Sequence, residues 1–156
     1  MTNQTSLSGQ DGGGVEQGAA LLELAARCEA GTGPDRELDC RIWWVLDGLS
    51  ISFEDTVAIV ADLHAWLAPY YTASLDAAMA LVPEGHTIQM SDWDAEILRE
   101  RGPWQAIVLP FRARGSLTDY TFTNRCDHAA TAPLALCAAA LRAITQATPT
   151  TEKANG

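Results

Sequence analysis

The sequence predicts an α+β fold, arranged as a helix/sheet/helix sandwich with a three-stranded antiparallel sheet. Two stretches, Tyr71–Gly85 and Ala130–Ala143, each have the pattern of one capped amphipathic helix. The segment between them alternates polar and apolar residues, which is the period of a half-buried strand. Three short strands joined by short connections favour an antiparallel meander, because parallel strands need long crossover connections.

Composition predicts one globular, soluble domain. The chain has 156 residues, of which 47% are hydrophobic and 19% charged. We expect a single domain over residues 15–147, flanked by a disordered arm at 1–14, rich in Gly, Ser and Gln, and a disordered tail at 148–156. No apolar run is long enough for a membrane span, and the first residues do not resemble a signal peptide. These features predict a cytoplasmic location.

Two helices are expected in the N-terminal third. The first covers Val15–Ala30, ends at Gly31, and should bury the stripe of Leu21, Leu24, Ala25 and Cys28. The second should have Pro34 in its first turn and acidic residues at its positive N-terminal end. Its acidic residues are Asp35, Glu37 and Asp39, and its buried stripe is Leu38, Ile42, Val45 and Leu46.

The next part of the chain combines an ambiguous segment with a clearer helix. Residues 49–70 fit either a helix apolar on two sides or a pair of short strands. Thr72 is the expected N-cap of the following helix, which Pro83 and Gly85 should end. Its expected buried stripe is Leu75, Ala78, Met79 and Val82.

Three strands and a last helix complete the expected fold. The strands are Thr87–Ser91, Gln105–Leu109 and Tyr120–Thr123. Thr131 should cap the last helix, where an alanine-rich flank would allow another helix to approach closely. The buried stripe of that helix is Leu134, Cys137, Ala138, Leu141 and Ile144.

Charge makes nucleic acid an unlikely partner but leaves a candidate ligand site. The net charge is −10, which opposes a broad electrostatic footprint on nucleic acid. Four arginines nevertheless cluster in the strand region: Arg101, Arg112, Arg114 and Arg125. They fit either solvated charges at strand ends or the rim of an anion site. The candidate ligand-binding residues are Arg112, Arg114, Arg125, Trp104 and Tyr120.

Catalytic and metal-binding patterns are weak. Cys126, Asp127 and His128 form the densest polar trio, but structural zinc needs four ligands at readable spacing. The carboxylates of residues 92–96 lack the glycine of a calcium loop. Cys28 and Cys137 lie on apolar helix faces, where a free thiol behaves as a small hydrophobe. We therefore predict no catalytic residues, no metal and no cofactor.

Five motifs together resemble the phage ABA sandwich domain, a family of small phage and prophage proteins. These motifs are Gly33–Asp39, Tyr71–Ala78, Leu81–Gly85, Pro133–Leu136 and Ala138–Ala143. In relatives, Thr is expected where Ala132 precedes Pro133, and residues 49–70 match nothing in the family. The resemblance implies layers of helix, sheet and helix, and a phage or prophage origin. It supplies no catalytic residue.

The expected function is that of a non-enzymatic phage or prophage accessory protein. It would bind a host or phage protein, or assemble as a homo-oligomer. The five tryptophans favour such contacts, because Trp is enriched at interface hot spots. The alternative is a binder of a small anionic ligand, such as a nucleotide, that uses the arginines and aromatic residues of the strand region.

Overall fold

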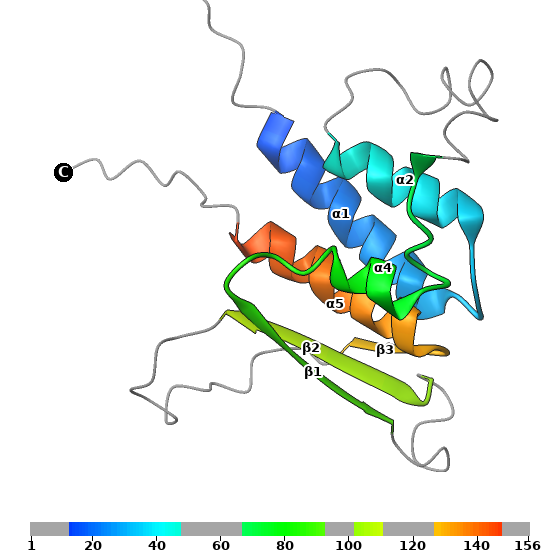
Figure 1. The fold of residues 1–156 in the computed structure, drawn as a ribbon. Coiled ribbons are helices and arrows are strands. Elements are labelled where there is room, and N and C mark those ends of the chain that lie inside the picture. Colours follow the sequence, from blue (N-terminus) through cyan, green and yellow to red (C-terminus); the bar gives the residue numbers. More distant parts are fainter. Residues whose placement is uncertain (1–12, 48–66, 93–101, 111–126, 148–156) are drawn as a thin grey trace, which may run out of the picture.

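The computed structural model describes residues 13–47, 67–92, 102–110 and 127–147. Along the chain, helices come first, a sheet follows, and a helix ends the described part, so the α+β class is confirmed (Figure 1). The elements are α1 (Gly13–Ala30), α2 (Arg36–Leu46), α4 (Leu75–Met79), β1 (His86–Asp92), β2 (Trp104–Pro110), β3 (Asp127–Ala129) and α5 (Ala132–Ala147). Helix α1 begins two residues before its expected start, while residues 1–12 and 148–156 lie outside the described ranges.

The three strands form an antiparallel sheet in the order β1-β2-β3, as expected. Ile88 of β1 lies opposite Val108 of β2, and Met90 lies opposite Ala106. These side chains pack against the core, so one face of the sheet is apolar. The third described strand is β3, whereas the strand expected at residues 120–123 lies outside the described residues. The short polar sequence of β3 carries no strand period.

Helix α5 is the central layer of the described fold. Figure 1 shows α5 lying along the sheet, with α1 packed on its other side and α2 beside α1. The labelled helices share one side of the sheet in this view. The alanine flank of α5 is buried, and so is the predicted stripe except for Ile144, which is half-buried. The buried residues are Leu134, Ala135, Leu136, Cys137, Ala138, Ala139, Ala140, Leu141 and Ala143. Small side chains on α5 let the sheet and α1 approach it from two sides.

Local signals start the helices, with two corrections. Asp35 caps α2 by accepting the Leu38 N–H at 3.0 Å, so Pro34 precedes the cap instead of entering the first turn. Thr131 caps α5 as predicted. Ser74, and not Thr72, is the N-cap of α4. Thr72 is engaged elsewhere, because its side chain pairs with the backbone of Asp35, the N-cap of α2.

Helix α4 also differs from prediction in its length and in the face it buries. It has only 5 residues and ends at Met79, before Val82. Ala78 is fully buried, but Leu75 and Met79 of the expected buried stripe are exposed. No helix in the described ranges is both long and apolar enough to cross a membrane.

Candidate functional site

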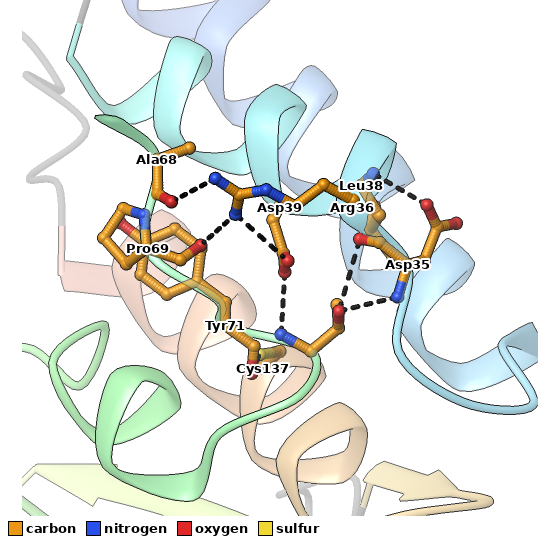
Figure 2. A network of polar contacts seen from close by, with 9 residues as sticks. Asp35, Arg36, Leu38, Asp39, Ala68, Pro69, Tyr71 and Cys137 are labelled. Atoms are coloured by element: carbon orange, nitrogen blue, oxygen red, sulfur yellow. Dashed lines mark hydrogen bonds and ion pairs between the residues drawn. The ribbon is translucent and has the colours of Figure 1, made fainter. Parts of the chain in front are cut away.

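A buried polar network joins the start of α2 to the segment before α4 (Figure 2). The Asp39 side chain accepts a hydrogen bond from the Thr72 N–H at 2.7 Å. Both residues are only 1% exposed. Arg36 donates to the carbonyl oxygens of Ala68, at 2.6 Å, and Pro69, at 3.0 Å. The Arg36 guanidinium also lies 3.4 Å from the Asp39 carboxylate, so the buried charge has a counter-ion.

A second pair of hydrogen bonds closes the network. The Asp35 N–H donates to the Thr72 hydroxyl oxygen at 2.8 Å, and the Thr72 hydroxyl lies 3.2 Å from the Asp35 carbonyl oxygen, to which it donates. The two segments are more than thirty residues apart in the chain. Because buried polar groups require partners, these bonds fix residues 68–72 against α2. The network therefore positions backbone, and its groups are engaged within the chain.

Burial shifts the pKa values of the titratable groups around this network upward. Burial raises the pKa of Asp39, and the Thr72 N–H and Arg36 only partly oppose it. Burial also raises the pKa of Tyr71. A contact with the Cys28 thiol and burial together raise the pKa of Cys137, whose thiol donates to the Tyr71 carbonyl oxygen at 3.4 Å. Catalytic thiols need a lowered pKa and some exposure, and Cys137 has neither.

The segment held by this network exposes four large apolar side chains. Their exposed fractions are 58% for Leu67, 58% for Tyr70, 40% for Leu75 and 49% for Met79. We call this set the 67–79 surface. Leu75 and Met79 are four residues apart on α4 and so lie on one side of it. The Arg36 guanidinium stacks on the Tyr70 ring, 4.0 Å from its centroid, and connects the surface to the network below.

Charges of both signs occur near the 67–79 surface, because Arg36 lies on Tyr70 and the segment itself carries acidic residues. Residues 67–92 contain three acidic residues, Asp76, Glu84 and Asp92, and no Lys or Arg. All three acidic residues are exposed, and Asp76 lies on α4 between Leu75 and Met79. Asp76 is thus the acidic side chain that shares α4 with the exposed Leu75 and Met79.

A second feature is a hollow of about 110 Å³ between α1 and α2. Its lining residues are Ala20, Glu23, Leu24, Arg27, Arg41, Trp44 and Val45. Small-molecule sites usually enclose about 300–1,000 Å³, so the hollow is too small for a nucleotide. The Glu37 carboxylate also lies 2.9 Å from Arg41 and 3.8 Å from Arg27. Both arginines of the hollow thus already share an acidic partner.

The predicted ligand site is described only at Trp104. Arg112, Arg114, Arg125 and Tyr120 lie outside the described residues. Trp104 is in β2, opposite Asp92 and Ala129, and packs against the hydrophobic core. Its place in the sheet serves packing, and the described residues bring no arginine of the predicted set to it.

Of the polar trio at residues 126–128, only Asp127 and His128 lie within the described residues. Cys126 lies outside the described ranges, as do the carboxylates of residues 94 and 96. Asp127 forms an ion pair with Arg142 of α5, and His128 lies opposite Gln105 in the sheet. Among the described residues, no three His, Cys, Asp or Glu side chains gather in a way that could hold a metal ion.

Comparisons with known proteins add no relative. No protein-family model, no curated protein and no solved structure matches the chain. The resemblance to the phage ABA sandwich domain therefore stays a prediction. The 67–79 surface was missed by sequence reasoning, which assigned Leu75 and Met79 to a buried stripe. The one available signal was the nearness of Pro83, which limits the helix to a length that cannot bury a full stripe.

Proposed function

We propose that this chain works by binding another protein through the 67–79 surface, and not by catalysis. The observation that carries the proposal is the exposure of four large apolar side chains within thirteen residues. Clustered exposed apolar side chains are typical of interaction sites, whereas single ones are ordinary. Tyr, Met and Arg are also enriched at the centres of interfaces, and Tyr70, Met79 and Arg36 supply all three.

The network beneath the surface supports this role. Binding costs conformational entropy for each side chain or loop that becomes ordered. Hydrogen bonds from Arg36 to the carbonyl oxygens of residues 68 and 69, and from the Thr72 N–H to Asp39, hold the loop in one arrangement beforehand. A loop fixed in this way loses less entropy when a partner arrives.

The biological setting that we propose is a phage or prophage accessory protein in the cytoplasm of a bacterial host. It rests on the five motifs quoted above, and the partner would be a host or phage protein. A homo-oligomer is the second form of this proposal. It is the less favoured form, because a chain with a net charge of −10 repels its own copies.

An anionic small molecule is a weaker candidate for the ligand. Of the residues proposed for it, only Trp104 is described, and that side chain packs on the core. The hollow between α1 and α2 offers two other arginines, but Glu37 competes for both. No second function is therefore proposed.

A capture experiment with matched variants tests the proposal. The tagged full chain is incubated with bacterial lysate, alongside Leu75→Ser/Met79→Ser and a control, Val15→Ser/Leu22→Ser. The control removes two exposed apolar side chains from α1. We expect wild type and control to retain the same protein, and the α4 variant to retain about ten-fold less, the loss typical of truncated interface anchors. Equal capture by all three chains would contradict the proposal, provided that circular dichroism shows each to be folded.

A further inference from the structure

We infer that Cys28 and Cys137 are the two halves of a latent disulfide, which joins α1 to α5 when the chain is oxidised. Both side chains are fully buried in the same hydrophobic core, and both thiols are free. The two thiols contact each other through a hydrogen bond, although the residues lie about 110 positions apart in the chain. Neither residue belongs to the 67–79 surface, so the disulfide is independent of the proposed binding function.

The packing of α1 on α5 places these two cysteines opposite each other. The two helices run in opposite directions along each other (Figure 1). Near one end of the contact, a Cβ atom at Gly31 would lie 3.3 Å from the Leu134 side chain. Cys28 is about one turn back along α1 and Cys137 about one turn forward along α5, so antiparallel helices bring the two thiols to the same level. A disulfide joins Cβ atoms about 3.8 Å apart, and thiols that already meet need little backbone movement to form it.

The Cys137 thiol is also held from the segment before α4. It donates to the Tyr71 carbonyl oxygen at 3.4 Å, and Figure 2 shows the two residues next to each other. This bond is lost when the thiol is oxidised, but a thiol is a weak donor. A cross-link between residues so distant in the chain removes much more entropy from the unfolded state. The disulfide should therefore stabilise the fold.

A small-molecule disulfide such as oxidised glutathione is the oxidant. One cysteine thiolate attacks a glutathione sulfur and releases a glutathione thiolate, which takes up the proton that the cysteine lost. The second cysteine thiolate attacks the mixed disulfide, so that the Cys28–Cys137 bond forms and a second glutathione leaves and is protonated. Two protein thiols and one glutathione disulfide thus become one protein disulfide and two glutathione thiols. Because both cysteines are buried, the first attack occurs when α1 opens away from α5, and the folded chain oxidises slowly.

The pair links the stability of the fold to the redox state of its surroundings. Reducing compartments keep such thiols reduced, whereas oxidising compartments allow disulfides to form and persist. Oxidation would then join the first helix to the last helix of the described fold.

Refolding in glutathione mixtures tests the inference. A full-length chain with Cys40→Ser and Cys126→Ser keeps only Cys28 and Cys137. The reduced chain is unfolded and then refolded in mixtures of reduced and oxidised glutathione, so that burial does not limit access of the oxidant. A second sample stays in urea in the same mixtures. Alkylation followed by mass spectrometry measures the fraction of each sample that holds the disulfide.

We expect the disulfide to form at least about thirty-fold more readily in the folded chain than in urea, as a stabilising cross-link requires. The oxidised chain should also melt about 5–10 °C above the reduced chain. A ratio of one or below would overturn the inference, as would an oxidised chain that melts lower or glutathione adducts in place of the disulfide. Peptide mapping of the wild-type chain in the same mixtures should show the same cross-link, so the result does not depend on the serine substitutions.

A second pair of cysteines is the matched control. The chain with Cys28→Ala and Cys126→Ser keeps Cys137 and Cys40, which lies on α2, a helix that packs on α1. Its disulfide should form no more readily in the folded chain than in urea. Equal preference for the folded state in both chains would overturn the inference, because the effect would then not depend on the contact between Cys28 and Cys137.

Discussion

The buried surroundings of Asp39 disfavour the charged form of its carboxyl group. Burial raises its pKa above the ordinary value of 3.8, despite the Thr72 N–H and the Arg36 guanidinium. A group with a raised pKa in the folded state binds its proton more tightly when folded. Its contribution to the free energy of unfolding is therefore complete below the unfolded pKa and is lost as the pH rises through the folded pKa.

The first prediction follows from that sign. Between pH about 3.5 and neutrality, wild type should lose free energy of unfolding relative to Asp39→Asn, which does not titrate. Urea unfolding of both chains at several pH values measures the difference and removes the shared effect of the other carboxyl groups. A difference that grows in favour of wild type with rising pH would mean that Arg36 outweighs burial.

Thr72 gives the second prediction, because its hydroxyl both accepts from and donates to Asp35. Thr72→Val keeps the shape but leaves those two backbone groups without this partner. It should lower the free energy of unfolding by about 1–3 kcal/mol, the cost of buried polar groups left unsatisfied. Thr87→Val, at an exposed position of β1, is the matched control and should change stability by less than about 0.5 kcal/mol. Thermal or urea unfolding measures both, and equal effects would contradict the role of Thr72.

The residue-level signals in the sequence were informative where a partner is close in the chain. Thr131 is the cap that its position predicted, and Asp35, which was expected just inside the start of α2, is the cap of that helix; in both, acceptor and donor are three residues apart. Thr72 also resembled a cap, but Asp35 lies 37 residues away and takes its hydroxyl instead. Long-range pairs such as this one follow from the fold, so local patterns cannot reveal them.

At the scale of elements, long periodic helices were predictable and short elements were not. The stripes of α1 and α5 are buried as their 3.6-residue period indicates. Helix α4 has a similar stripe but only one turn and a half, so Ala78 enters the core while Leu75 and Met79 remain outside. Strand β3 has three residues, too few for a period of two to be recognised.

The approach of β3 to the turn before β2 gives the third prediction. Gly102 has φ +91°, and a Cβ atom there would lie 2.3 Å from the backbone of Ala129. Gly102→Ala should therefore displace β3 and cost about 1–3 kcal/mol through strain at a left-handed position. Gly33→Ala is the control, since no atom lies within 4 Å of its Cβ position and its φ is ordinary. Urea unfolding should show the control within about 1 kcal/mol of wild type or more stable.

The whole molecule depends on contacts that no local pattern contains. The 67–79 surface arises because a short helix fully buries only Ala78 and leaves Leu75 and Met79 exposed. The ligand site expected around the arginines of the strand region shows a second limit of prediction from sequence. Closeness in sequence suggested a site there, but Trp104 was assigned to it without knowledge of the sheet face on which it lies.

Arg142 joins three layers and gives the last prediction. From α5 it forms an ion pair with Asp127 of β3 and donates two hydrogen bonds to Glu29 of α1, at 3.1 and 2.9 Å. Its partners are 21% exposed at Glu29 and 3% at Asp127. Removing one member of a buried ion pair leaves its partner's charge uncompensated, which costs about 3–5 kcal/mol.

We therefore expect Arg142→Met to cost several times more stability than Arg41→Met, whose partner Glu37 is 60% exposed and whose ion pair is worth about 0–1 kcal/mol. Methionine keeps most of the aliphatic volume, so the loss reports charge and not packing. Adding Asp127→Asn and Glu29→Gln to Arg142→Met should restore part of the lost stability, because the stranded carboxylates then disappear. Denaturant unfolding of the four chains measures each step. If the triple variant were no more stable than Arg142→Met alone, hydrogen-bond geometry, and not uncompensated charge, would account for the loss.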